Sequence, residues 1–151
     1  MTAAQSPQLG LDPETAFFIV LKAREFHTKV ELIDPDAASE PADDRAVDVL
    51  QFHPDDSVTD ELIAAIGSLN EEERLDLIAL IWVGRGEYSL WQWQDARERA
   101  RRIDPERVLD YILGMPMVSD FLEEGLSRFG HHIRDHLNSG FVGARDELLP
   151  D

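Results

Sequence analysis

The chain has 151 residues, of which 43% are hydrophobic and 30% are charged, and its formal net charge is −17. This composition is typical of one globular domain and not of a disordered chain. The sequence contains no cysteine, which excludes disulfides, thiolate metal sites and cysteine nucleophiles. The charge argues against nucleic-acid and anionic-membrane binding, because both need a cationic surface.

The acidic composition has three interpretations. It keeps the protein soluble, which is the interpretation we favour, or it reflects a salt-rich cytosol, or it mimics the charge of a nucleic acid. The N-terminal stretch lacks the basic segment of a signal peptide, since its first cationic side chain is Lys22, and the longest apolar run has seven residues. We therefore expect a cytoplasmic protein.

The pattern of apolar residues predicts about six helices and no strand, and the first helix is expected at residues 13–33. Asp12 followed by Pro13 combines a favoured N-cap with proline at the first helical position. The residue before Pro35 is pushed out of the helical conformation, which ends the helix. Apolar residues recur in it at steps of three and four, the spacing of one helix face: Ile19, Ala23, Phe26, Val30 and Ile33.

A buried central helix is predicted at about residues 71–83. Asn70 and Glu73 have the spacing of a capping box, in which each side chain bonds the other residue's backbone. The following residues 77–83 include no polar side chain. A helix that is apolar on every face must be surrounded by other elements. The segment Gly84-Arg85-Gly86 is expected to end this helix as a turn.

Four more helices are expected, at about residues 57–66, 89–102, 105–114 and 116–129. Short loops between consecutive helices favour antiparallel neighbours, and so an all-α compact bundle. Residues 34–57 are expected to form an acidic linker, in which residues 45–52 could add a short helix, and residues 131–151 a polar tail. The sequence thus predicts a single domain over residues 1–151 with a helical core at 58–130.

The first candidate ligand-binding site is Arg85 with Trp82. An arginine held in a rigid turn could bind a carboxylate or a phosphate through its planar guanidinium group. The alternative that we favour is an internal ion pair, with Glu123, Glu124 and Asp120 as the expected partners. A phosphate loop is excluded, because no Gly-Lys-Ser/Thr follows the glycines.

The three carboxylates are themselves a candidate site. Asp120, Glu123 and Glu124 lie at positions i, i+3 and i+4 of one predicted helix, so they crowd one side and repel one another. Crowded carboxylates can raise a pKa for acid–base chemistry or bind a metal ion. The favoured interpretation is a solvated face opposite Val118 and Leu122.

Two histidines have a spacing that metal sites use. His132 and His136 lie at i, i+4. They are weak metal candidates because no third ligand accompanies them and they lie beyond the last clear helix. We therefore expect no metal and no cofactor. His27 and His53 are isolated and are interpreted as structural or solvated.

The chain also carries one arginine cluster and three tryptophans. We expect internal pairing along the helix for most of the cluster, because Asp95 and Glu98 each precede an arginine by four residues. Trp82 and Trp93 are expected in the core. Trp91 flanks the apolar stripe of its helix, so it is the tryptophan expected to reach a partner. The arginines of the cluster are Arg97, Arg99, Arg101, Arg102 and Arg107.

Three segments of the sequence resemble a prokaryotic family known only as a domain of unknown function. They are LIALIWVGRGEY (77–88), YILGMP (111–116) and DFLEEGL (120–126), and the resemblance covers about residues 58–130. It implies a shared helical core and no assigned activity. The residues that it marks are mostly of the turn and cap type, which favours structure over catalysis. They are Trp82, Gly84, Arg85, Gly86, Gly114, Pro116, Glu123, Glu124 and Gly125.

A strong core pattern without a complete catalytic constellation favours a non-enzymatic protein-interaction or regulatory module. Its partner would be another protein or a second copy of the chain, because residues 17–21 form an unbroken apolar row that exceeds one contact face. Neither a nucleic acid nor a membrane is expected as partner. Two alternatives stay open: a small-anion-binding protein or enzyme that uses Arg85 with Glu123 or Glu124, and a nucleic-acid mimic.

Overall fold

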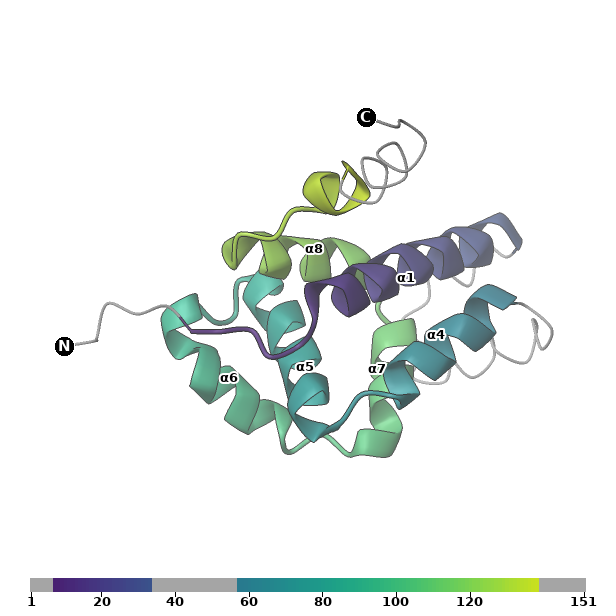
Figure 1. Cartoon of the computed structure of the whole chain (residues 1–151). Helices are drawn as coiled ribbons and strands as arrows, with labels where there is room; N and C mark the ends of the chain where they lie inside the picture. Colours follow the sequence, from purple (N-terminus) through teal and green to yellow (C-terminus); the bar gives the residue numbers. More distant parts are fainter. Residues whose placement is uncertain (1–6, 34–56, 139–151) are drawn as a thin grey trace.

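The computed structural model describes residues 7–33 and 57–138 (Figure 1). The fold is an all-α compact bundle, as predicted, and this part of the chain contains no strand. Residues 133–138 are also helical. The elements in chain order are α1 (Pro13–Ile33), α4 (Ser57–Gly67), α5 (Glu71–Arg85), the 3-10 turn η1 (Leu90–Gln92), α6 (Trp93–Ala100), the 3-10 turn η2 (Pro105–Arg107), α7 (Val108–Leu113) and α8 (Val118–Arg128).

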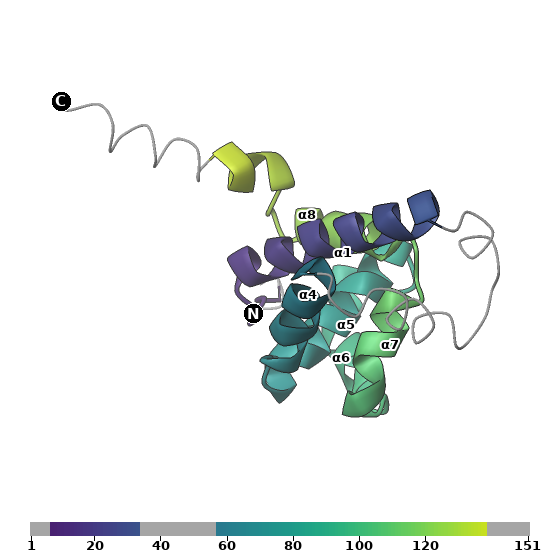
Figure 2. The same cartoon turned by 90° about the vertical axis from the view of Figure 1, so that its right-hand side faces the viewer.

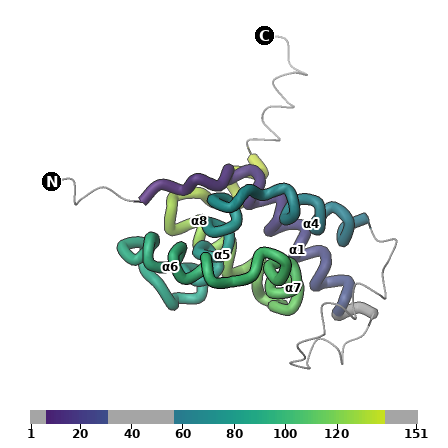
Figure 3. The backbone as a smooth tube through the Cα atoms, turned by 90° about the horizontal axis from the view of Figure 1, so that it is seen from below, coloured from purple at the N-terminus to yellow at the C-terminus, as the bar shows by residue number. Residues whose placement is uncertain are grey.

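Helix α5 is the centre of the bundle. Its expected capping box is present: the Glu73 backbone N–H donates to Asn70 Oδ1 at 2.8 Å, and the Asn70 N–H donates to Glu73 Oε1 at 2.9 Å. Every residue from Leu75 to Val83 is buried. Helices α8 and α6 pack directly on α5, and α7 lies near α4 (Figures 1 and 3). The prediction of a buried central helix is confirmed.

The end of α5 differs from the expected Gly-Arg-Gly turn. The helix continues through Gly84 to Arg85, and only Gly86 adopts the left-handed conformation, with φ of 89°. Gly84 instead meets α8: a Cβ atom there would lie 1.8 Å from the carbonyl oxygen of Phe121. The interpretation of Gly84 as a turn residue was therefore wrong, because its missing side chain serves a helix crossing.

Helix α1 covers one side of the core, and the apolar face of the helix is buried in this contact. It lies beside α8 and α4 (Figure 2). The first part of its apolar row packs inside the same chain, since Phe17, Ile19 and Val20 are buried, while Phe18 is exposed by 39%. The apolar excess that suggested self-association through this row is thus largely used within the chain.

The described part of the segment expected as a polar tail contains local structure. Gly130, with φ of 90°, follows the end of α8, and the chain then forms a helical segment at residues 133–138. This segment touches α1, because the His136 ring stacks on Phe17 with the ring centres 4.9 Å apart. Residues 45–52 and His53 lie outside the described residues. No helix in the described ranges has the length and apolar character needed to span a membrane.

Candidate functional site

Arg85 lies at the surface end of α5 among aromatic residues. Its Nη1 donates to the Tyr111 hydroxyl at 3.4 Å, and the guanidinium carbon is 5.8 Å from the centre of the Phe121 ring. Trp82 Nε1 donates to the same hydroxyl at 2.8 Å. The carboxylate that Arg85 contacts is Glu87, at 2.9 Å. The expected pairing with Glu123, Glu124 or Asp120 was therefore wrong.

Those three carboxylates have other arginine partners. Arg24 of α1 contacts Asp120 at 3.1 Å and Glu123 at 2.9 Å, so this ion pair joins α1 to α8. The hydrogen bond that Arg24 donates to Glu123, together with the attraction of both carboxylates, raises the pKa of Arg24 above its usual value. Glu124 pairs with Arg128 along α8 at 2.9 Å. The structure thus separates Arg85 from the two glutamates with which we had combined it.

The carboxylates do line one groove, between α8 and the helical segment 133–138. Its volume is about 650 Å³, and four carboxylates and one guanidinium line it. Arg24 and Arg128 pair with three of these carboxylates, and Arg134 adds a third positive charge, so the groove is a mixed polar surface and not a strong field of negative charge. The lining residues are Asp120, Glu123, Glu124, Ser127, His132, Ile133, Arg134 and Asp135.

The two histidines considered as metal ligands have different surroundings. His136 Nδ1 lies 3.1 Å from Glu14 Oε2 of α1, and its ring stacks on Phe17. His132 lines both the groove and a smaller cavity of about 240 Å³ beside Glu14 and Asp135. Within residues 7–33 and 57–138, no group of three or more potential ligands could hold a metal ion.

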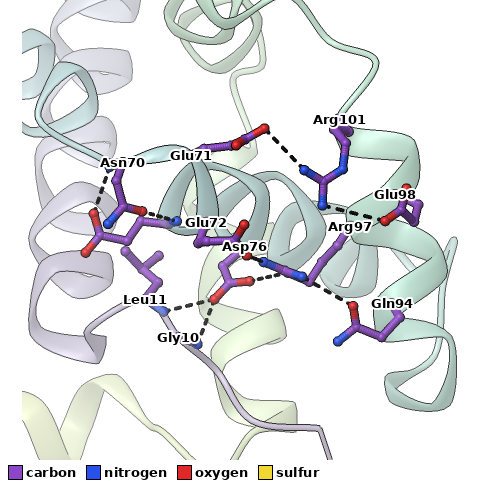
Figure 4. Close-up of polar contacts among 11 residues, drawn as sticks. Gly10, Leu11, Asn70, Glu71, Glu72, Asp76, Gln94, Arg97, Glu98 and Arg101 are labelled. Atoms are coloured by element: carbon purple, nitrogen blue, oxygen red, sulfur yellow. Dashed lines mark hydrogen bonds and ion pairs between the residues drawn. The ribbon is translucent and has the colours of Figure 1, made fainter.

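A buried carboxylate that the sequence analysis missed is the most enclosed charged group of α5. Asp76 is only 2% exposed, yet both of its oxygens have donors (Figure 4). Oδ2 accepts hydrogen bonds from the backbone N–H groups of Gly10 at 2.7 Å and Leu11 at 2.9 Å. Oδ1 accepts from Arg97 Nε at 2.7 Å. Asp76 therefore ties the segment before α1 and helix α6 to the central helix.

Arg97 completes this network, and its charge state follows from it. Burial by itself would lower the pKa of Arg97, but the hydrogen bonds to Glu72 and Asp76 outweigh this effect and raise it. The same contact lowers the pKa of Glu72 below its usual value. Arg101 likewise turns toward α5, where it contacts Glu71 at 3.2 Å. The network is structural in character, because its charges satisfy one another.

One comparison finds that the central part of the chain is similar to a known family of domains. Residues 59–131 match the family model described as "Protein of unknown function (DUF3775)". The expectation of a domain of unknown function is thereby supported. The matched part begins inside α4 and ends after α8, so it contains Trp82, Arg85, Glu123 and Glu124, whereas α1 lies outside it. No curated protein and no solved structure is significantly similar to the chain.

The DUF3775-matching part also contains the most exposed tryptophan. Trp91 is 72% exposed, whereas Trp82 is 7% and Trp93 is 1% exposed. Trp93, Ala96 and Ala100 turn α6 toward the core, and the opposite side of η1 and α6 faces solvent. We call this side the α6 outer face. Its exposed residues are Trp91, Asp95, Glu98, Arg99 and Arg102.

The charges of the α6 outer face are paired differently from what the sequence spacing predicted. Glu98 contacts Arg101, three residues on, at 3.6 Å, and not Arg102. The expected pair of Asp95 with Arg99 does not form. Within the described ranges, Arg99 and Arg102 contact no carboxylate. Two guanidinium groups therefore remain available beside an exposed tryptophan.

Proposed function

We propose that this protein is a non-enzymatic protein-interaction module and that the α6 outer face is its docking surface. The observation that carries the proposal is the 72% exposure of Trp91. Tryptophan and arginine are the residues most enriched among the side chains that dominate binding energy in protein interfaces. A face that combines Trp91 with Arg99 and Arg102 has this composition.

The local structure holds Trp91 in a defined position. The η1 turn that carries it is fixed by the Gln92 side chain, which accepts a hydrogen bond from the Ser89 backbone N–H at 2.9 Å. Two residues after Trp91, the buried Trp93 packs edge-on against Phe129, with ring centres 4.8 Å apart. Because both neighbours are fixed, little backbone freedom is lost when the Trp91 side chain is covered by a partner.

The partner that fits this face has an apolar pocket for the indole ring and carboxylates beside it. Arg99 and Arg102 can each hold a carboxylate in a two-point contact. Asp95 lies on the same face and can accept from a basic or amide group of the partner. Because the face carries both positive and negative side chains, it favours a partner surface with the complementary arrangement of charges. It does not attract every cationic protein equally.

The alternatives have weaker support. A small-anion site that combines Arg85 with Glu123 or Glu124 is not supported, because these side chains do not pair with one another. Arg85 contacts Glu87, and Glu123 contacts Arg24. The nucleic-acid mimic rests on the net charge of −17 alone. We therefore develop the protein-interaction proposal only.

The experiment is site-specific photo-crosslinking followed by a binding measurement. A photo-reactive phenylalanine analogue replaces Trp91 in cells that produce the protein, and the control places it at Glu106, an exposed residue of η2. We expect a discrete protein to be crosslinked at position 91 and not at position 106. The captured protein is then purified and titrated against the parent, Trp91→Ala and Glu106→Ala.

We expect Trp91→Ala to weaken binding by roughly 30-fold or more, since an interface anchor contributes about 2 kcal/mol or more. Glu106→Ala should bind like the parent. The thermal midpoint of Trp91→Ala should also match the parent, because the indole is mostly exposed. Equal affinity of Trp91→Ala and the parent would remove the α6 outer face as the docking surface.

A further inference from the structure

Helix α1 binds the rest of the molecule through non-covalent contacts that a helix from another chain could also make. It lies across α4 and α8 (Figure 2), and it lies outside the DUF3775-matching residues 59–131. In the sequence, residues 34–56 connect it to α4. We call the side of α4 and α8 that α1 covers the α1 seat.

The fit between α1 and its seat is apolar along the middle of the helix. The α1 residues that face the seat are completely or almost completely buried, and the seat contributes residues of α4 and α8 to the same core. An amphipathic helix lying with its apolar face in a groove is a common mode of recognition between separate chains. The buried residues of α1 are Ala16, Phe17, Ile19, Val20, Ala23, Phe26 and Val30.

Charge complementarity fixes the orientation of α1 on both flanks of the seat. Lys22 Nζ lies 2.7 Å from Glu61 of α4. On the other flank, Arg24 lies 2.9 Å from Glu123 and 3.1 Å from Asp120 of α8. The cations are thus on the helix and the carboxylates on the seat. If two identical chains exchange this helix, each cation again meets a carboxylate.

The ends of α1 add polar contacts that are specific for this helix. Before α1, the backbone N–H groups of Gly10 and Leu11 donate to Asp76 of α5. Further along it, His27 Nε2 lies 2.9 Å from the carbonyl oxygen of Leu113 in α7. These contacts join α1 and the residues before it to α5 and α7, next to the seat. They are non-covalent, so α1 of any copy of the chain can make them.

We propose that the α1 seat also accepts α1 of a second copy of this chain, which gives a reciprocal dimer that exchanges residues 7–33. Such an exchange re-forms the same contacts between chains, so it costs little in contact energy. The connecting 34–56 segment, at roughly 3.3–3.6 Å per residue when extended, is long enough to reach a neighbouring copy. This proposal concerns a different surface from the α6 outer face and is independent of it.

The tether sets the concentration at which the exchange competes. A helix that is covalently joined to its own seat has an effective concentration there on the order of 1 mM. The parent protein is therefore expected to be monomeric at micromolar concentration. A test must weaken the contact within one chain while it keeps the contact between chains.

The first experiment reverses the charges on one side of the contact at a time. One variant carries Arg24→Glu, and the other carries Asp120→Lys with Glu123→Lys. In each variant alone, α1 meets like charges on its own α8. In an equimolar mixture, each α1 finds opposite charges on the α8 of the other variant. We expect the mixture to form a 1:1 dimer of twice the 17.1 kDa chain mass.

Analytical ultracentrifugation and native mass spectrometry measure the mass of the species in each sample. Circular dichroism shows whether each variant is folded. The matched control carries all three substitutions in one chain, which restores the attraction within the chain, and it should remain monomeric. A mixture that keeps the monomer mass while both variants are folded overturns the proposal. So does a control that dimerises as strongly as the mixture.

The second experiment does not depend on the charge variants. The chain has no cysteine, so single cysteines can report contacts between chains. Lys22→Cys is mixed with Glu61→Cys, whose parent side chains meet at their ends, with Nζ and Oε1 2.7 Å apart, and in parallel with Glu106→Cys. A short thiol-specific crosslinker spans the two positions, because cysteine side chains are shorter than the parent pair. At concentrations near 1 mM, we expect several-fold more crosslinked dimer in the first mixture than in the second. Equal yields overturn the proposal.

Discussion

Gly84 of α5 lies directly against the main chain of Phe121 in α8. A Cβ atom on Gly84 would lie 1.8 Å from the Phe121 carbonyl oxygen and 2.7 Å from the carbonyl carbon. A reciprocal contact occurs at Gly125 of α8, where a Cβ atom would lie 2.4 Å from the carbonyl oxygen of Leu80. The two glycines let the backbones of α5 and α8 touch at their crossing.

Gly84→Ala is therefore expected to destabilise the protein. The obstacle is backbone, which cannot rotate away as a flexible side chain can, so the loss should lie at or above the upper end of the usual 1–3 kcal/mol for overpacking, about 3 kcal/mol. Urea denaturation measures the change in the free energy of unfolding. The control is Gly67→Ala at the end of α4, where a Cβ atom has nothing within 4 Å. Equal stability of the two variants would contradict the close crossing.

Arg85→Ala should change stability little. The side chains of Arg85 and Glu87 are 36% and 44% exposed, and ion pairs in such positions contribute about 0–1 kcal/mol. The thermal midpoint, measured by circular dichroism, should lie close to that of the parent. A loss of several kcal/mol would mean that Arg85 has a buried partner after all.

Asp76→Ala should be strongly destabilising. It removes the acceptor of two backbone N–H groups and leaves Arg97, whose side chain is only 13% exposed, without its buried partner. Breaking such a buried pair costs about 3–5 kcal/mol. Glu72→Gln is the matched control, because it removes the exposed carboxylate that contacts the same arginine. Denaturation of both variants in urea compares them, and similar small losses would refute the role of Asp76.

The Glu72–Arg97 contact also predicts a dependence on pH. Because Arg97 lowers the pKa of folded Glu72 below its usual 4.5, this carboxylate favours the folded state above about pH 4.5. Its contribution is lost as the pH falls through the lowered value. The carboxyl resonance of Glu72, followed by NMR, should titrate below pH 4.5 in the parent and shift upward in Arg97→Gln. An unchanged midpoint in that variant would exclude the contact as the cause.

The parts of the fold that depend on local sequence could be predicted. The capping box of Asn70 and Glu73 joins residues three apart, and the signal of Asp12 and Pro13 lies within two positions, so both were visible in the sequence. Gly84 could not be assigned correctly from such signals. A glycine near a helix end is favoured both for a turn and for a close crossing, and its neighbour Phe121 lies 37 positions further along the chain.

The same limit applies to the candidate site. We expected Arg85 to pair with the carboxylates of α8, but Asp120 and Glu123 pair with Arg24 of α1. This pairing follows from the packing of α1 on α8, which the sequence does not show. Asp76 did leave a signal, since it is a lone carboxylate between Leu75 and Leu77 in a helix that turns apolar. Its partners lie far away in sequence, so that signal predicts a buried charge without naming what satisfies it.

The hydrogen bonds from the segment before α1 bear on how this protein can be divided. A recombinant fragment cut to residues 59–131 would retain Asp76 but lose the amides of Gly10 and Leu11 that satisfy one of its oxygens. It would also present to water the apolar side of α8 that α1 covers. A soluble expression product should therefore start before Gly10, or receive residues 7–33 as a separately supplied peptide.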